Sequence, residues 1–328
     1  MKVAKKLLKG LLITLAILVG IVLVLFLFLA YKGSKNPPRP IIEEGYFKST
    51  VTSGELEKKY TAMGAFDVSE YVVSANDKAA KTYRIWYPTV LESGSRAFPL
   101  VVIANATASP AELYEPYFEH LASWGFVVAG DDCGGTGSGK SVEKLLAFCL
   151  CENENSKSVL YGKIDLDNIG ISGASQGGPG ALNAVNNFEN GKYYKTIFTA
   201  STLNKGLAKL FRWDYDVSKI HIPYFLCAGT GDTDGSEKTG IAPLSLLNEC
   251  FEALSDGVPK VMGRCVGAEH EDMLQASDGY MTAWMLYWLQ GDEEAGTVFF
   301  GEDPEIARNV GWQDVRIYSF TPFFYNTR

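Results

Sequence analysis

Apolar runs, and stretches in which apolar and polar residues alternate, divide most of the chain into strands and helices. Two segments, Phe98–Ala104 and Phe126–Gly130, contain only apolar and small residues. Continuous runs of this kind are typical of strands that are covered on both faces. The strands expected from the whole pattern are Lys81–Tyr87, Phe98–Ala104, Phe126–Gly130, Ile169–Ser172, Lys195–Ala200, Tyr224–Ala228 and Lys260–Val266.

Helical patterns separate these strands. Ser109 is a capping residue followed by proline, so we predict a helix from there to Trp124, ended by Gly125. Further helices are expected after Ser175, at Leu244–Leu254 and at Gly279–Leu289. This alternation predicts an α/β fold with a mostly parallel, doubly wound sheet and helices on both faces. The early strands have little helical pattern between them, which predicts antiparallel strands at the N-terminal edge.

The N-terminus has a different pattern. Leu11–Ala30 is a run of twenty residues without a charge, long enough to cross a ~30 Å hydrocarbon core as a helix. A cleaved signal peptide is the alternative, but its apolar region is usually shorter and is followed by small residues. We therefore predict a basic cytoplasmic tail at 1–10, a transmembrane signal anchor at 11–31, a linker at 32–45 and a folded domain at 46–328.

Charge changes this picture in two ways. The chain has a formal charge of -8, but residues 1–40 contain seven positive side chains and no acid, so 23 positive and 38 negative side chains remain in residues 41–328. A domain with a net charge of -15 is a poor partner for nucleic acid. Four lysines precede the apolar run and three positive residues follow it. The excess before the run predicts a membrane protein whose domain is extracytoplasmic.

Six cysteines are compatible with an oxidising location without requiring one. Cys227 lies in an apolar strand and is expected to be a free core thiol. Cys250 and Cys265 are spaced so that a disulfide between a helix and the next strand is one possibility. No Cys/His cluster has the spacing of metal ligands, so no metal or other cofactor is expected.

The first candidate for chemistry is the segment Gly173-Ala174-Ser175-Gln176-Gly177, directly after a predicted strand. A G-x-S-x-G turn between a strand and a helix is the pattern of a nucleophile elbow. Such a turn holds the serine hydroxyl at a helix N-terminus, where the amide of Gln176 can donate to a developing oxyanion. The alternative is a small-residue turn that only lets the helix pack on the strand.

The chain has three histidines, and only one is well placed to act as a base for this serine. His120 lies on a predicted helix and is expected at its surface. His221 precedes a strand and therefore lies at the wrong edge of a parallel sheet. His270 follows a strand, at the edge where doubly wound sheets place their sites.

The acid is expected between the serine and the histidine in the chain order. Asp232 follows the strand Tyr224–Ala228 and is the expected acid, with Asp234 as the alternative. The oxyanion needs a second amide donor, which we expect in the loop after Ala104, from Thr107 or Ala106.

A second motif competes for the function. Gly134–Ser141 satisfies G-x-x-x-x-G-K-S, the pattern of a phosphate-binding loop. Asp131 and Asp132 precede it, however, and would place two negative charges beside a triphosphate. We therefore interpret this segment as a glycine-rich loop on the rim of the site, and nucleotide binding as the weaker reading.

At these residues the chain resembles the α/β-hydrolase superfamily, and within it the bacterial cutinase, polyester hydrolase and lipase group and related acetylhydrolases. The resemblance covers about Tyr83 to Phe300. It implies serine hydrolysis of carboxylic esters, no cofactor, a Ser175–Asp232–His270 triad and Thr107 as the oxyanion donor. The segments that carry it are Arg84–Pro88, Leu121–Val128, Asp165, Gly173–Gly178, Gly229–Asp232, Gly267–His270 and Thr282–Met285.

The chain also departs from the pattern of this group. Ala174 stands where polyester hydrolases often carry an aromatic residue, and Ala106 replaces the usual glycine of the oxyanion loop. We therefore expect a small-molecule or lipid ester as the substrate rather than a polymer. The expected protein is a monomeric, membrane-anchored serine esterase. An amidase or acyltransferase with the same triad, and a non-catalytic tethered binding domain, remain alternatives.

Overall fold

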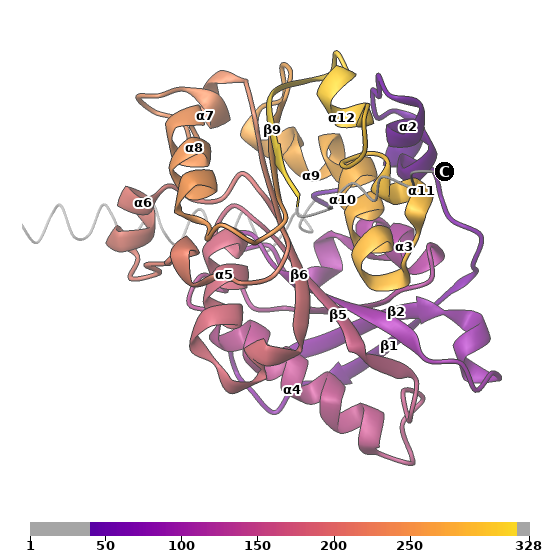
Figure 1. Ribbon diagram of the computed structural model, residues 1–328. Helices are drawn as coiled ribbons and strands as arrows, with labels where there is room; N and C mark the ends of the chain where they lie inside the picture. Colours follow the sequence, from indigo (N-terminus) through magenta and orange to yellow (C-terminus); the bar gives the residue numbers. More distant parts are fainter. Residues whose placement is uncertain (1–39, 320–328) are drawn as a thin grey trace, which may run out of the picture. The chain divides into compact units, whose positions relative to one another are not determined.

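The computed structural model describes residues 40–319 and contains a nine-stranded sheet in the order β1-β2-β4-β3-β5-β6-β7-β8-β9 (Figure 1). All seven predicted strands are present. The strands are β1 (Val68–Ser74), β2 (Thr82–Pro88), β3 (Phe98–Ala104), β4 (Val127–Asp131), β5 (Ile164–Ala174), β6 (Tyr194–Ala200), β7 (Tyr224–Gly229), β8 (Lys260–Cys265) and β9 (Trp312–Tyr318).

Strands β4, β3, β5, β6, β7 and β8 are parallel, which confirms the predicted parallel sheet. The antiparallel N-terminal edge is also confirmed, because β1 pairs with β2 and β2 pairs with β4 in this sense. At the other edge β9 pairs antiparallel with β8, which the sequence analysis did not predict. Asp314 interrupts the apolar alternation of β9 and has a φ of 53°, beside a register shift in the pairing.

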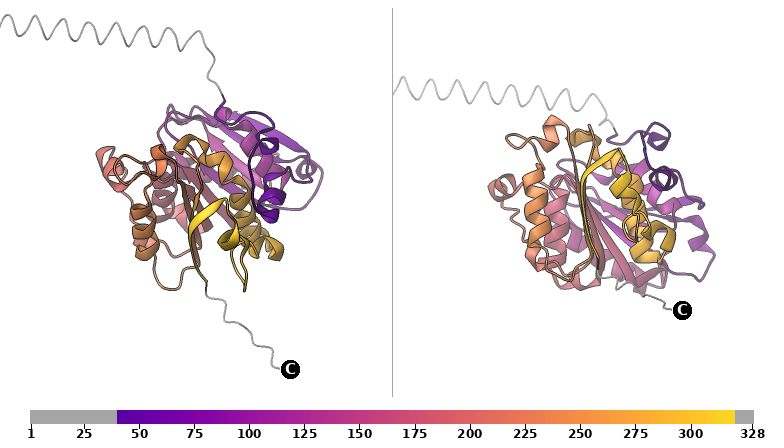
Figure 2. Two further views of the ribbon diagram at one scale, coloured as in Figure 1. Left: turned by 90° about the horizontal axis from the view of Figure 1, so that it is seen from above. Right: turned by 45° about the horizontal axis from the view of Figure 1, so that its top comes forward.

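Helices cover both faces of this sheet. The helices are α2 (Glu55–Thr61), α3 (Glu115–Ser123), α4 (Lys140–Glu154), α5 (Gly177–Asn187), α6 (Lys205–Leu210), α7 (Asp232–Gly235), α8 (Leu244–Ala253), α9 (Met273–Ala276), α10 (Asp278–Met285), α11 (Glu293–Gly296) and α12 (Glu305–Arg308). Figure 1 shows α4, α5 and α8 on one side of the strands and α3 and α10 on the other, and Figure 2 gives two further views of these layers.

Strand β3 shows why two cores form. Leu100 and Val102 point into the cluster that contains α4, α5 and α8. Val101 and Ile103 point into the cluster that contains α3 and α10. Successive side chains of a strand face opposite sides, so an all-apolar strand is buried twice. The sheet is therefore held between two buried layers, one on each face.

The helix predicted from Ser109 to Trp124 begins later than expected. A 3₁₀ turn at Ala111–Leu113 comes first, and α3 starts only at Glu115. Pro116 lies in the first turn of α3, where its missing N–H is tolerated and where it prevents one continuous helix from Ser109. The predicted end is correct, since Gly125 has a φ of 89°.

The compact unit begins at Ile41, inside the segment that was expected to be a linker. Ile42 is buried, and the N–H of Ile41 donates to the carbonyl oxygen of Leu113 at 2.8 Å. In the described part of the chain, none of the helices has the length and apolar character needed to cross a bilayer. The predicted anchor at 11–31 lies outside the described residues.

His120 was expected at a helix surface, and this expectation is wrong. The side chain is fully buried, with Nδ1 3.0 Å from Oδ2 of Asp278 and Nε2 2.9 Å from the carbonyl oxygen of Ala62. The hydroxyl of Tyr46 donates to the same Oδ2 at 2.7 Å. The N-terminal segment covers this face of α3, which could not be seen from the helical pattern alone.

The His120–Asp278 pair gives a stability prediction. Burial alone would lower the pKa of His120. The charge of Asp278 and the hydrogen bonds raise it by more than burial lowers it, so the pKa lies above 6.5. Replacing His120 by glutamine removes the imidazole that can carry a positive charge beside the buried Asp278, while the neutral hydroxyl of Tyr46 still donates to it. This loss should lower the free energy of unfolding by about 3–5 kcal/mol.

This difference should depend on pH. A group whose pKa is raised by folding stabilises the folded state fully below its unfolded value of 6.5, and this contribution is lost as the pH rises through the folded pKa. Urea unfolding of the wild type and His120→Gln at a series of pH values should therefore show the largest difference below pH 6.5. A difference that grows with pH would contradict the assignment.

Candidate functional site

Ser175 lies in a strained turn between β5 and α5. Its φ is 55°, in the left-handed region that non-glycine residues rarely adopt. A Cβ on Gly173 would lie 2.1 Å from the carbonyl oxygen of Gly177, and a Cβ on Gly177 would lie 2.0 Å from that of Ala104. The two glycines are therefore required by the close approach of backbone on both sides of the serine. This geometry is that of the predicted nucleophile elbow.

His270 connects this serine to a carboxylate. Its Nε2 lies 3.0 Å from Oγ of Ser175, and its Nδ1 lies 2.8 Å from Oδ1 of Asp234. The serine is partly exposed, the imidazole is 20% exposed and the carboxylate is fully buried. The three side chains come from the carboxyl ends of β5, β8 and β7, so the predicted edge of the sheet is correct for all of them.

The expected acid, Asp232, is not the partner of His270. The structure corrects this expectation to Asp234, which had been the alternative. Asp232 is the first residue of α7 and is exposed, whereas Asp234, two positions later in the same helical turn, points inward. Its Oδ2 accepts hydrogen bonds from the amide of Gly229 and the hydroxyl of Ser201, both at 2.6 Å. Spacing alone does not separate the two aspartates, because the direction depends on where α7 begins.

Glu269 links the loop that carries His270 to the loop that carries the acid. Its carboxylate accepts from the amides of Asp232 at 3.2 Å and Thr233 at 2.8 Å, and also from the hydroxyl of Thr233. The same hydroxyl oxygen accepts from the amide of His270 at 3.0 Å. A carboxylate at the start of a helix satisfies amides that have no partner within the helix. The sequence analysis assigned no role to Glu269 or Thr233.

The predicted oxyanion donors come from two segments, Gln176 from the elbow itself and Thr107 or Ala106 from the loop after β3. Gln176 directly precedes α5, and no hydrogen bond from its amide is found in the described part of the chain. The amide of Ala106 donates to the hydroxyl of Tyr114 at 3.1 Å. No such acceptor is found within residues 40–319 for the amide of Thr107. Of the two residues expected to donate from this loop, Thr107 therefore has the available amide.

The glycine-rich segment Gly134–Ser141 packs against the elbow and does not form an open phosphate cradle. The carbonyl oxygen of Gly134 accepts from Nε2 of Gln176 at 2.9 Å and from the amide of Ala108 at 3.0 Å. The carbonyl oxygen of Gly137 accepts from Nδ2 of Asn183 at 3.0 Å. These contacts place the segment beside both the nucleophile and the oxyanion loop, which is the geometry expected of a rim loop.

A buried polar cluster supports the oxyanion loop from below. Nδ2 of Asn105 donates to the backbone oxygen of Asp131 at 2.5 Å and to its Oδ1 at 3.1 Å. The hydroxyl of Thr136 donates to the carbonyl oxygen of Asn105 at 2.6 Å. Burial raises the pKa of Asp131 to about 7. The end of β3 is thus fixed to the end of β4 by side chains to which the sequence analysis gave no supporting role.

The cysteines take no part in this site. All six are free thiols, so the possible disulfide between Cys250 and Cys265 does not form. Cys227 is buried as expected, and burial raises the pKa of its thiol. Within residues 40–319 no cluster of three or more histidine, cysteine or acidic side chains is arranged to hold a metal ion.

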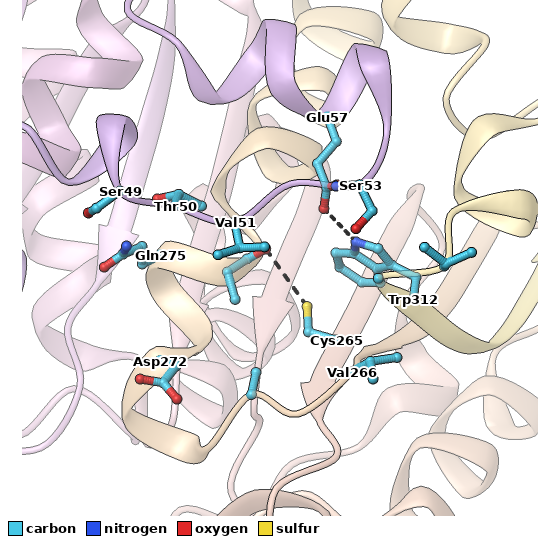
Figure 3. Close-up of a pocket in the computed structure, with 14 residues that line it drawn as sticks. Ser49, Thr50, Val51, Ser53, Glu57, Cys265, Val266, Asp272, Gln275 and Trp312 are labelled. Carbon is cyan, nitrogen blue, oxygen red and sulfur yellow. Dashed lines mark hydrogen bonds between the residues drawn. The ribbon is translucent and has the colours of Figure 1, made fainter.

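A pocket of about 520 Å³ lies behind the histidine loop and is lined by residues that include Ala268 and Asp272 (Figure 3). On its far wall the indole nitrogen of Trp312 donates to Oε1 of Glu57 at 2.7 Å. Figure 3 shows this contact at one end of the pocket and Asp272 at the other. Neither Ser175 nor His270 lines it.

A strained serine on a mostly parallel α/β sheet, hydrogen-bonded to a histidine and through it to a buried aspartate, defines the class of α/β serine hydrolases. A comparison with known families matches residues 52–311 to the PETase family, described as PET hydrolase-like. The chain therefore belongs to this family of carboxylic ester hydrolases, which confirms the resemblance found in the sequence. No curated protein matches the chain.

The close approach at Gly177 gives a prediction. In Gly177→Ala the new methyl group meets the backbone oxygen of Ala104, which cannot move without shifting β3. We expect a loss of about 1–3 kcal/mol of stability and weaker labelling of Ser175 by a fluorophosphonate. Gly135→Ala is the matched control, since a Cβ there has nothing within 4 Å. Equal melting temperatures and labelling rates for both variants would show that the elbow tolerates the methyl group.

Proposed function

We propose that Ser175, His270 and Asp234 form the catalytic triad with which this enzyme hydrolyses carboxylic esters. The observation that carries the proposal is the placement of His270, whose two ring nitrogens lie 3.0 Å from Ser175 Oγ and 2.8 Å from Asp234 Oδ1. A serine hydroxyl is a weak nucleophile unless a base accepts its proton. The imidazole is within reach of that proton, and the carboxylate fixes which nitrogen is free to accept it.

In the first step, Oγ of Ser175 forms a bond to the ester carbonyl carbon while its proton moves to Nε2 of His270. The carbonyl electron pair moves to the oxygen, which the amides of Gln176 and Thr107 stabilise. One such donor typically lowers the barrier by about 3–4 kcal/mol. Asp234 stabilises the imidazolium through Nδ1–H and keeps its own negative charge.

In the second step, the bond from the carbonyl carbon to the leaving oxygen breaks. The alcohol departs with the proton from Nε2 of His270, and the acyl group remains on Ser175. A water molecule then repeats the sequence: His270 accepts its proton, the oxygen attacks the acyl carbon, and Ser175 regains its proton as the acid leaves. No bound cofactor takes part in these steps.

The proposed enzyme is anchored in a membrane by residues 11–31 and acts outside the cytoplasm on a small-molecule or lipid ester. The uncharged run Leu11–Ala30 and the lysines that precede it support the anchor and its orientation. The substitutions at Ala174 and Ala106 support a substrate other than a polymer.

The two aspartates provide the test. We expect Asp234→Asn to lower kcat for p-nitrophenyl butyrate by about 10⁴-fold, because the amide favours the wrong imidazole tautomer. Asp232→Asn is the matched control and should retain wild-type turnover, since its side chain is exposed. Ser175→Ala should abolish both turnover and fluorophosphonate labelling. Full activity of Asp234→Asn, or labelling of Ser175→Ala, would contradict the proposed roles.

A substitution of Lys140 distinguishes the proposed esterase function from nucleotide binding. Lys140 is the exposed first residue of α4 and is the lysine of the phosphate-loop pattern. We expect Lys140→Ala to change ester turnover by less than about twofold, because exposed substitutions away from a site have small effects. Isothermal titration with Mg²⁺ and ATP should show no binding to the wild type. If the wild type bound ATP and Lys140→Ala did not, the result would support the hypothesis that Gly134–Ser141 is a phosphate-binding loop.

A further inference from the structure

The segment from Lys205 to Trp213, here called the α6 protrusion, presents apolar side chains to solvent. Leu210 is 72% exposed and Phe211 is 52% exposed. They are the one pair of adjacent large apolar residues, within residues 40–319, in which both are more than half exposed. Figures 1 and 2 show α6 at the periphery of the domain. Burial of these two side chains in an apolar phase would be favourable by a few kcal/mol.

Local structure around α6 holds Leu210 and Phe211 in their exposed positions. Asn204 caps α6 by accepting from the amide of Leu207 at 3.0 Å, and Ala208 is buried on the inner side. Arg212 has a φ of 61°, which ends the helix and reverses the chain. The ring of Phe211 stacks on that of Trp213, with centroids 4.9 Å apart. The exposed pair is therefore held outward by a capped helix and by a ring stack, and does not result from a free loop.

The charges of the protrusion differ from those of the rest of the domain. Lys209 and Arg212 flank the apolar pair, are exposed, and have no ion-pair partner in the part of the chain that the structure describes. Lys205 pairs with Glu249 at 2.5 Å. Asp214, just beyond the protrusion, is the nearest acid along the chain. In a domain with a net charge of -15, two free cations beside two exposed apolar side chains are a local exception.

The protrusion borders the catalytic edge. The amide of Leu203, two residues before α6, donates to the carbonyl oxygen of Ser175 at 3.2 Å. At the other end, a Cβ on Gly137 would lie 2.4 Å from the indole of Trp213, so this ring packs on the rim loop. The residue that leads into the protrusion, Leu203, thus contacts the elbow, and the last residue of the protrusion, Trp213, packs on the rim loop.

The same edge of the sheet carries a second exposed apolar group on the other side of the histidine loop. Val51 and Val310 are 88% and 82% exposed and line the pocket of Figure 3, together with Val266, which follows β8. Ile41, where the compact unit begins, contacts the connection after β3, again at the carboxyl edge. Ile41, the first residue of the compact unit, therefore lies at the same edge of the sheet as these apolar side chains.

We propose that the α6 protrusion docks on an anionic lipid bilayer and brings the catalytic edge to its surface. Aromatic and aliphatic side chains with lysine or arginine beside them are the composition that partitions into the interface of a membrane. Free cations attract anionic headgroups, whereas the acidic remainder of the domain is repelled and turns away. The substrates that this arrangement favours are esters presented in lipid, a point that rests on the proposed esterase function.

The test uses the full-length chain reconstituted with phosphatidylcholine and phosphatidylglycerol, so that the N-terminal segment is the same in every variant. Brominated acyl chains quench tryptophan fluorescence on contact. The quenching that is lost in Trp213→Phe is the contribution of Trp213, and it measures contact between the protrusion and the lipid. We expect this Trp213 contribution in the wild type and in Tyr161→Glu, and we expect it to be absent from the double variant Leu210→Glu with Phe211→Glu. Tyr161 is 52% exposed and precedes β5 at the opposite edge, which makes it the matched control.

A second pair, Lys209→Gln with Arg212→Gln, leaves the apolar residues unchanged. It should lose the increase in Trp213 quenching that phosphatidylglycerol gives over phosphatidylcholine alone. Equal quenching in the wild type and both pairs, or no Trp213 component in the wild type, would overturn the docking. A dimer in lipid-free sedimentation that the glutamate pair dissociates would instead identify the surface as an interface between copies.

Comparing the hydrolysis of a soluble ester with that of a bilayer-embedded ester distinguishes an effect on docking from an effect on catalysis. The glutamate pair should hydrolyse p-nitrophenyl butyrate at the wild-type rate and a long-chain ester embedded in the bilayer about tenfold more slowly. A wild type without activity on either ester would refute the proposed function and leave the quenching result standing. Equal loss on both esters would show that the substitutions damage the fold, and would contradict a role confined to docking.

Discussion

The site depends on one imidazole that is held from both sides. His270 contacts Ser175 through Nε2 and Asp234 through Nδ1, and each of those partners is fixed at the end of a different strand. The serine is fixed by a left-handed turn, and the carboxylate by the amide of Gly229 and the hydroxyl of Ser201. The rest of the fold serves this arrangement, because β5, β7 and β8 run parallel in one sheet that is packed on both faces, so their carboxyl ends lie at the same edge.

The sequence predicted β2 to β8, the parallel sheet, the elbow and the histidine because each has a local signal, but it did not predict the edge strands β1 and β9. An all-apolar strand such as β3 can be recognised without its neighbours, and G-x-S-x-G is a contiguous pattern. The choice between Asp232 and Asp234 has no such signal, since it depends on the direction in which a short helix leaves β7. His120 was misplaced for a related reason: what buries it is the N-terminal segment around Tyr46, far away in the chain.

The domain is acidic as a whole, whereas the α6 protrusion proposed to bind lipid is locally cationic. An acidic domain is soluble and is repelled by anionic lipid at most of its surface. Lys209 and Arg212 interrupt this pattern next to the catalytic edge, where Leu210 and Phe211 are also exposed. A uniformly basic domain would adhere in any orientation. An acidic one with a small cationic and apolar region selects a single orientation.

The carboxylate of Glu269 has a consequence for anyone who reshapes this enzyme by loop grafting. Glu269 belongs to the histidine loop, but its carboxylate oxygens accept hydrogen bonds from the backbone amides of Asp232 and Thr233 in the neighbouring loop. If the loop that carries the acid were transplanted into another scaffold without the histidine loop, the first turn of α7 would lose the carboxylate that caps it. The transferable unit is therefore the pair of loops, and a chimaera that respects this boundary inherits a complete acid–base couple.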